Sequence, residues 1–210
     1  MTIPLRIASF GAMLLLAACA NLDPRAPSPV PTVAAVDLDR FAGPWYLIAH
    51  IATERDREAH NAVETYQPQA DGSVSMVYTN RLGGFDGEPK RMTPTGFPVA
   101  GSGNALWGIR FQLPGTAISW PFLYEYRISH LEPDYSVMIV ARSRLDFLWL
   151  FSRQPSMSAA QFAGYQQMIA EWGYAPEALL RVPQCWPAGV QPGPVPPPAL
   201  PDCDDRNTGL

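Results

Sequence analysis

Residues 41–50 read F-A-G-P-W-Y-L-I-A-H and follow a Pro-rich leader. A Gly two positions before a Trp, at the start of an apolar run, is typical of a first strand that is entered through a tight turn and places a large ring in a core. The stretch therefore predicts the start of a folded domain. Its meaning depends on a matching stretch at the far end of that domain.

The composition indicates one globular domain between two extended segments. The chain has 210 residues, of which 47% are hydrophobic and 16% are charged, and this is enough for one substantial core. The net charge of -4 is mild, so the chain lacks the basic surface that a nucleic-acid partner requires. The 23 prolines concentrate at the two ends.

The first residues have the features of an export signal. Arg6 is positive, and the apolar run at 7–18 is too short for a permanent transmembrane helix. The run ends in L-A-A-C at 16–19, which resembles the lipobox of bacterial lipoproteins. The resemblance implies a signal peptide at 1–18, acylation of Cys19 with palmitate among the chains, and an anchor in the outer membrane facing the periplasm. A plain signal peptide, cut after Ala18, is the alternative.

Both Pro-rich ends are predicted to lie outside the folded domain. Residues 19–36 should form the acylated Cys and a stiff tether, and residues 185–210 should form a disordered tail. Cys185 and Cys203 flank that tail. In an exported protein they can form a disulfide, or both can remain free.

The middle of the chain has the pattern of an antiparallel meander. Short runs rich in β-branched and aromatic residues are separated by Gly, Pro, Asp or Asn. The expected strands are 44–52, 61–68, 73–81, 89–98, 104–113, 120–130, 135–142 and 146–153. In 120–130, aromatic residues alternate with Glu125 and Arg127, which places these two charged residues on a solvated exterior.

The last two predicted strands are apolar on both faces, so they need a cover on each side. The next segment predicts that cover. Ser158 and Gln161 have the spacing of a capping box, and apolar residues recur at helical intervals up to Trp172. The predicted fold class is therefore all-β: an eight-stranded antiparallel up-and-down barrel with one C-terminal α-helix packed outside.

Three separated motifs resemble those of the lipocalin family. Gly43 and Trp45 match the G-x-W motif that opens lipocalins, and D-F-L-W-L-F-S-R at 146–153 resembles their closing strand, with Arg153 as its motif residue. V-P-Q at 182–184 matches a final signature of the bacterial outer-membrane lipocalins and their relative apolipoprotein D. The resemblance covers 37–184 and implies a ligand-binding cup.

The resemblance also implies structural roles. Trp45 would close the floor of the cup, and Arg153 would lie across its indole ring while donating hydrogen bonds to carbonyls of the chain there. Leu47 and His50 stand where the relatives usually have Glu and Arg. With strict alternation, Leu47 and Ala49 should share the inward side of Trp45, and His50 should face outward.

The expected function is that of a membrane-anchored lipocalin which binds or transports a lipophilic small molecule, a fatty acid or a lysophospholipid, in the barrel. Its partners are then this molecule and the membrane, and a homodimer is left open. Strand alternation selects the candidate ligand-binding residues, although a shift of one residue would exchange the whole set. They are Leu47, Tyr78, Ile109, Phe111, Tyr124, Tyr126, Val137 and Ile139.

No catalytic motif stands out, so the chain is predicted not to be an enzyme and to need no cofactor. His50, His60 and His130 lack metal-ligand spacing, so no metal site is predicted. Two alternatives remain. An isomerase or epoxide-handling enzyme would need a buried carboxylate, whereas the predicted interior offers only Tyr hydroxyls. An envelope scaffold would have a barrel filled by bulky residues such as Trp107 and Phe122.

Overall fold

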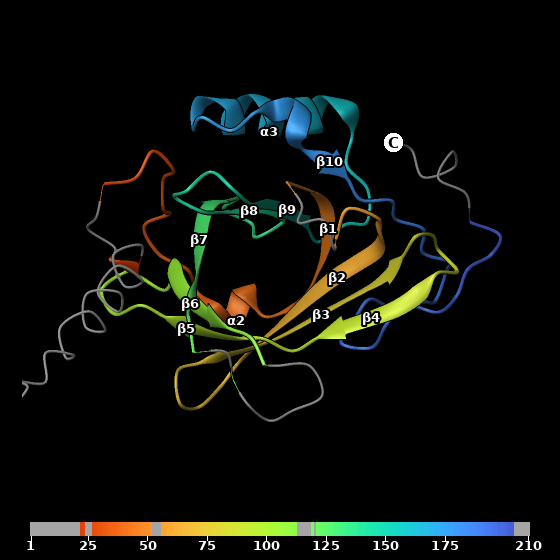
Figure 1. The fold of residues 1–210 in the computed structure, drawn as a ribbon, viewed down its shortest axis with the longest axis horizontal. Helices are drawn as coiled ribbons and strands as arrows, with labels where there is room; N and C mark the ends of the chain where they lie inside the picture. The colour runs from red at the N-terminus through yellow and green to blue at the C-terminus, as the bar shows by residue number, and fades with distance from the viewer. Residues whose placement is uncertain (1–21, 24–26, 52–55, 113–118, 120, 204–210) are drawn as a thin grey trace, which may run out of the picture.

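The computed structural model describes residues 22, 23, 27–51, 56–112, 119 and 121–203. Its ten strands form one antiparallel sheet in the order β10-β1-β2-β3-β5-β6-β7-β8-β9, with β4 paired to β3. Pairing of β1 with β9 closes eight of them into a barrel (Figure 1). The predicted fold class is confirmed, with β4 and β10 as additional strands. The predicted signal peptide and the predicted acylation site Cys19 lie outside the described residues.

The strands follow one another along the chain as a meander. Their bounds are β1 Gly43–Ile51, β2 Ala59–Pro68, β3 Val74–Leu82, β4 Glu88–Met92, β5 Thr95–Pro98, β6 Leu106–Arg110, β7 Tyr124–Leu131, β8 Val137–Ala141, β9 Leu148–Ser152 and β10 Leu180–Arg181. The helices are α2 Leu38–Phe41, α3 Ala159–Glu171 and the short 3-10 helix η2 Pro176–Ala178.

The strand predicted at 89–98 is two strands in the structure. β4 pairs with the end of β3, and β5 pairs with its start. Pro94 lies between them and has no N–H to continue the ladder, while its carbonyl accepts a hydrogen bond from the Met76 N–H at 3.1 Å. The proline therefore divides the run, which sequence alternation alone does not reveal.

Helix α3 covers β1, β8 and β9 from outside the barrel (Figure 1). The Ser158 side chain accepts a hydrogen bond from the Gln161 N–H, and the Gln161 side chain accepts one from the Ser158 N–H, so the predicted capping box is present. Phe162 and Ile169 of the helix are buried against the apolar outer face of the strands. This layer explains why β8 and β9 are apolar on both faces.

The V-P-Q segment joins β1 to β2 where these strands no longer pair. Their ladder extends only from Gly43 to Tyr46 of β1. Beyond it, the Gln184 side-chain amide donates to the carbonyls of Leu47 (2.8 Å) and Ala62 (3.2 Å), and the Asn61 N–H donates to the Pro183 carbonyl. The segment thus satisfies backbone groups that the separation of the strands leaves open.

The segment before the domain packs on the barrel. The Val33 N–H donates to the Ile128 carbonyl at 3.0 Å, and Val30 is buried. Arg127 donates to the Thr32 hydroxyl of this segment and forms an ion pair of 2.9 Å with Glu125, and the two residues are 3% and 4% exposed. The predicted solvated exterior at these two residues is wrong, because both are buried and their charges pair with each other.

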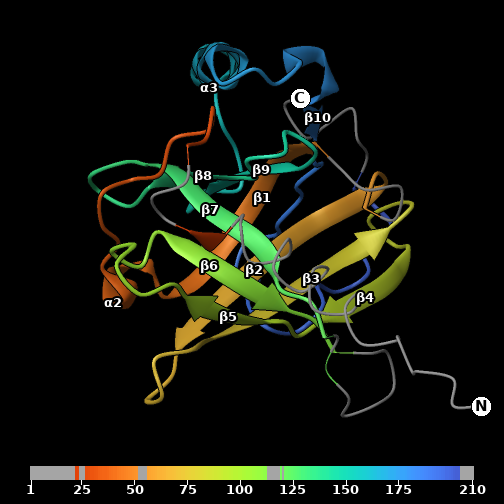
Figure 2. The same ribbon diagram turned by 60° about the vertical axis from the view of Figure 1, so that its left-hand side comes forward.

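The Pro-rich segment after the domain, for which the sequence predicts disorder, lies along β3 and β4 as far as Cys203 (Figure 2). The Arg81 side chain donates to the carbonyls of Pro197 and Pro198, and the Arg91 side chain donates to the carbonyl of Pro194. Cys185 and Cys203 form a disulfide. This pairing decides between the two states that the sequence left open.

Candidate functional site

The candidate site is the interior of the barrel, which is lined by alternate residues of its strands. These side chains form one hydrophobic cluster that is separate from the cluster under α3. Its larger members are Phe41, Trp45, Leu47, Tyr66, Met76, Tyr78, Trp107, Ile109, Tyr126, Ile128, Met138 and Phe151. The two clusters lie on opposite faces of the same strands, as expected for a pleated sheet buried on both sides.

One end of the barrel is closed by Trp45 and Arg153. The Arg153 guanidinium lies 3.9 Å from the centre of the indole ring. It donates to the carbonyls of Pro44 at 2.8 Å, Arg40 at 2.9 Å, and Phe41 and Ala42 at 3.0 Å each. Burial lowers the pKa of Arg153 to about 10, which still leaves it charged at neutral pH. These contacts tie α2 and the start of β1 to the end of β9.

Gly43 permits this closure. Its φ is +93°, a backbone conformation that residues with a side chain rarely adopt. A Cβ at this position would also come within 3.4 Å of the Arg153 guanidinium. The backbone conformation therefore favours glycine at this position, and a Cβ there would touch the motif arginine.

Above the closed end, the rings of Phe41, Tyr66, Trp107 and Tyr126 pack against one another inside the barrel and form an aromatic floor. Trp107 stacks on Tyr126 with centroids 5.6 Å apart, and the edges of Phe41 and Tyr66 face it at 5.5 and 6.0 Å. Trp107 is fully buried, whereas Phe122 is 50% exposed. Of the two residues considered as fillers of the barrel, only Trp107 therefore occupies the interior.

A buried carboxyl lies on top of this aromatic floor. Glu64 of β2 accepts hydrogen bonds from the hydroxyls of Tyr66 (2.9 Å) and Tyr126 (3.4 Å), and the two hydroxyls also contact each other. Burial raises the pKa of Glu64 to about 7, although both hydrogen bonds lower it. The prediction that the interior offers only Tyr hydroxyls is therefore wrong.

The sequence did contain a signal for Glu64. Ala62, Glu64 and Tyr66 are two residues apart on one predicted strand, so they share a face. Tyr66 has the size of a core residue, and its face is therefore the inward one. A charged residue between two inward positions is a candidate for an interior acid.

A β-bulge turns His50 into the barrel. The register between β1 and β9 shifts between Leu47 and Ala49, so Ile48 is the additional residue. Ile48 and Ala49 both pack in the outer cluster, and His50 pairs with Trp149, whose ring packs against the interior cluster. The predicted orientations of Ala49 and His50 are thus reversed, because the bulge interrupts the alternation.

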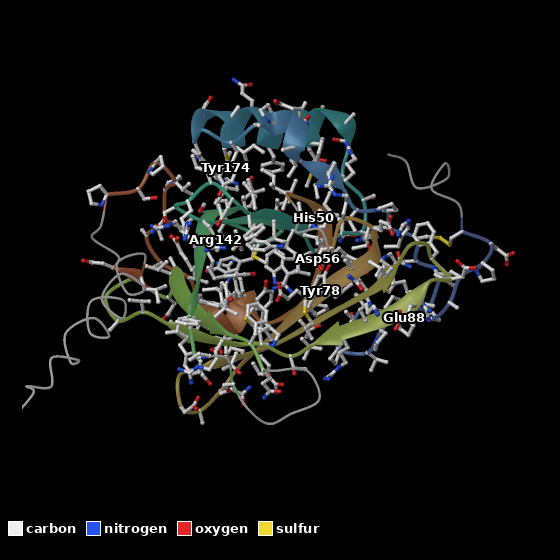
Figure 3. The ribbon with its side chains drawn as sticks, viewed as in Figure 1. His50, Asp56, Tyr78, Glu88, Arg142 and Tyr174 are labelled. Atoms are coloured by element: carbon white, nitrogen blue, oxygen red, sulfur yellow. A yellow bond between two sulfur atoms is a disulfide. The ribbon has the colours of Figure 1, made fainter. Side chains whose placement is uncertain are left out.

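His50 is 1% exposed and neutral. Burial, together with the nearby charge of Arg57, lowers the pKa of its imidazole to about 4. Among the described residues, its Nδ1 has no hydrogen-bond partner. Figure 3 shows His50, Asp56 and Tyr78 between the β1–β9 side and the β3–β4 side of the barrel.

Tyr78 and Asn80 of β3 form a second polar pair in the interior. The Asn80 amide donates to the Tyr78 hydroxyl at 3.2 Å. In the described part of the chain, the Oδ1 atom of Asn80 is buried and has no partner. Burial and the negative charge of Asp56 raise the pKa of Tyr78, so its hydroxyl keeps its proton.

The predicted ligand-binding residues are divided between both faces of the sheet. Leu47, Tyr78, Ile109 and Tyr126 belong to the interior cluster, and Phe111 packs against it. Tyr124 shares the face of Tyr126 but is 38% exposed, in ring contact with Phe111 at 5.5 Å. Val137 and Ile139 lie in the outer cluster under α3. Their placement in the interior is corrected, because β8 is apolar on both faces and its pattern does not distinguish them.

Neither a metal-binding cluster nor a membrane-spanning helix is found among the described residues. No group of three or more His, Cys, Asp or Glu residues in this part of the chain is placed to hold a metal ion. Within the same residues, no helix is long and apolar enough to cross a membrane.

The sequence is similar to bacterial outer-membrane lipoproteins. The outer membrane lipoprotein Blc of Vibrio cholerae is 26% identical over 162 residues, which cover 75% of this chain and 88% of the relative. Blc of Citrobacter freundii is 27% identical over 169 residues, or 78% and 85% of the two chains. Blc of Escherichia coli K12 is 26% identical over 155 residues, or 72% and 80%.

Solved structures share the fold. Insecticyanin from the tobacco hornworm Manduca sexta has a TM-score of 0.57 at 11% identity and covers 76% of this chain and 85% of its own. The cockroach allergen Per a 4 has a TM-score of 0.55 at 13% identity and covers 74% and 92%. The family model described as a lipocalin-like domain matches residues 36–184. Since this match spans well over half of a chain whose barrel is closed by β1 and β9, the protein belongs to the lipocalin family.

Proposed function

We propose that the protein binds a lipophilic small molecule, a fatty acid or a lysophospholipid, inside the barrel. The supporting observation is the gradient of exposure along the interior. Trp45 and Trp107 at the closed end are 0% exposed, whereas Tyr126 is 6% and Tyr78 is 8% exposed. The side chains further from the closed end are therefore slightly more accessible than those at it. Each methylene of an acyl chain buried there would contribute about 0.8 kcal/mol to binding.

The test is a titration of the purified protein with palmitate and with lysophosphatidylcholine, followed by native mass spectrometry. We expect saturable binding of one molecule per chain. Phe111→Ala, which removes an apolar side chain near the open end of the barrel, should weaken lipid binding by about tenfold. Tyr165→Phe, on the outer helix α3, is the matched control and should leave it unchanged. Absence of saturable binding to either lipid would refute the proposal.

The protein is further proposed to act at the outer membrane, anchored through acylated Cys19 and facing the periplasm. The names of the bacterial relatives and the lipobox resemblance support this location. Several acyl chains on one residue would hold the protein firmly. Labelling cells with palmitate should mark the protein, and Cys19→Ser should abolish both the label and the recovery of the protein with outer membranes. An unlabelled protein would contradict the anchor.

A lipocalin-fold isomerase or epoxide-handling enzyme is the second candidate. Glu64 supports it, because a buried carboxyl with a pKa of about 7 can exchange protons near neutral pH. A screen of lipophilic epoxides and unsaturated ketones tests this candidate. Turnover that is lost in Glu64→Gln would support it, whereas equal turnover in the wild type and in Glu64→Gln would refute a role for this carboxyl.

A further inference from the structure

The pair Tyr78 and Asn80 has unused hydrogen-bonding capacity on both sides. The Asn80 amide N–H₂ donates to the Tyr78 hydroxyl, so the hydroxyl proton of Tyr78 remains available to an acceptor. The Oδ1 atom of Asn80 remains available to a donor, and within the described residues nothing occupies it. Asn80 is 2% exposed. A buried amide oxygen without a partner is uncommon in folded proteins and points to a partner that the described residues do not supply.

The pair lies in the interior, on the side of β3 that a ligand would contact. Tyr78 belongs to the interior cluster, and Asn80 is two residues further along the same strand and therefore on the same face. Figure 3 places Tyr78 at the centre of the barrel. Across the ladder, Tyr78 pairs with Met92 and Asn80 pairs with Lys90. The interior face thus continues from the polar pair to the exposed rim strand β4.

The pair is uncharged, and the charges near it have both signs: Arg57 is close enough to lower the pKa of His50, and Asp56 is close to Tyr78. The Asp56 carboxylate is close enough to raise the pKa of Tyr78 and that of Glu64. The nearest cation across the ladder, Lys90, is at the rim, 43% exposed, and in an ion pair of 2.8 Å with Glu88. An ionised carboxylate has no proton to donate to Asn80. An uncharged hydroxyl both donates and accepts, and an amide group does so through its N–H and its C=O, which matches the pair.

We propose that Tyr78 and Asn80 recognise an uncharged hydroxyl or amide group next to the acyl chain of the ligand. This rests on the proposed function and narrows it, because it separates hydroxylated acyl lipids from free fatty-acid anions. The group accepts a hydrogen bond from the Tyr78 hydroxyl and donates one to Oδ1 of Asn80. The acyl chain then continues along the apolar interior.

Three ligands with the same acyl chain test the proposal: monolauroylglycerol, methyl laurate and laurate. Their affinities are measured at pH 8 by displacement of N-phenyl-1-naphthylamine, a neutral fluorescent probe. We expect monolauroylglycerol to bind about tenfold more tightly than methyl laurate, the gain from hydrogen bonds that would otherwise be unmade. The affinity of monolauroylglycerol should exceed that of laurate by at least the same factor.

Asn80→Leu, which replaces the amide with an apolar group of similar size, should remove this preference while probe binding persists. Thr79→Val is the matched control: Thr79 is adjacent on β3, but its hydroxyl donates outward, to the Gly193 carbonyl at 3.5 Å. The Thr79→Val variant should retain the preference for monolauroylglycerol. Circular dichroism establishes that each variant is folded, and the three ligands on the unaltered protein suffice if Asn80→Leu does not fold.

The outcomes separate the two proposals. Probe binding without preference among the three ligands would overturn this inference and leave the proposed function standing. The same holds for a preference that persists in folded Asn80→Leu. If neither the probe nor any ligand binds, the proposed function fails and the inference fails with it.

Discussion

At the scale of single residues, Glu64 and His50 are two buried groups whose contributions to the free energy of unfolding change with pH in opposite directions. Glu64 keeps its proton up to about pH 7 in the folded protein but loses it near 4.5 when unfolded. The free energy of unfolding therefore falls by about 3 kcal/mol between these values. His50 is neutral down to about pH 4 when folded but is protonated below 6.5 when unfolded. Its contribution rises by about 3 kcal/mol over that range.

The two contributions should nearly cancel in the wild type between about pH 4.5 and 6.5. In Glu64→Gln only the contribution of His50 remains, so we expect stability to increase with pH by about 2 to 3 kcal/mol over this range. Urea unfolding at several pH values measures it. Glu177→Gln, at an exposed position on η2, is the control and should follow the wild type. A Glu64→Gln variant with the pH dependence of the wild type would contradict the prediction.

Arg153 is the second residue whose chemistry makes a quantitative prediction. Its planar guanidinium serves four carbonyls and stacks on an indole ring, which an ammonium group cannot reproduce. We expect Arg153→Lys to lower the free energy of unfolding by about 2 kcal/mol. Arg144→Lys, at a side chain that is 66% exposed, should change it by less than about 0.5 kcal/mol. Equal effects of the two substitutions would show that charge alone matters at Arg153.

At the scale of elements, α3 is the cover that lets β8 and β9 be apolar on both faces. Its first turn depends on the reciprocal bonds of Ser158 and Gln161. Ser158→Ala should cost about 1 kcal/mol of stability, because the Gln161 N–H loses its partner. Ser156→Ala, two residues earlier and exposed, should be nearly neutral. Thermal unfolding of both variants measures this, and a Ser158→Ala protein as stable as the wild type would exclude a role for the cap.

The strands themselves were predictable to different degrees. The capping box, the turns and the alternation in β7 follow from local chemistry, so the helix and most strands could be placed from the sequence. The division of 89–98 by Pro94 and the bulge at Ile48 are departures from regular ladders. Pro94 is a local signal that the alternation pattern passes over, whereas the bulge depends on which strand lies next to β1, and the pattern of a single strand does not contain this information.

At the scale of the whole molecule, the segments before and after the barrel are part of its packing. The disulfide between Cys185 and Cys203 closes the segment that Arg81 and Arg91 hold against β3 and β4. Replacing both cysteines with Ser should lower the free energy of unfolding by about 3 kcal/mol, since a loop of this length loses its covalent constraint.

Urea unfolding of oxidised protein and of the double variant measures this difference. Limited proteolysis should in addition cleave the double variant within 186–202 faster than the oxidised protein. Identical urea midpoints would mean that the hydrogen bonds of the segment, rather than the disulfide, hold it in place.

The sequence by itself determined the barrel fold and its closed end. Gly43, Trp45 and Arg153 are recognisable because each meets a requirement of local geometry or chemistry, and the alternation along the strands indicates a two-faced sheet. Only the tertiary structure decided what faces the interior. Glu64 became a buried acid, His50 turned inward, Val137 and Ile139 went to α3, and the Glu125–Arg127 pair was covered. The physical reason is that burial is set by neighbouring strands and segments distant in sequence, and a one-residue bulge or an added layer reverses it.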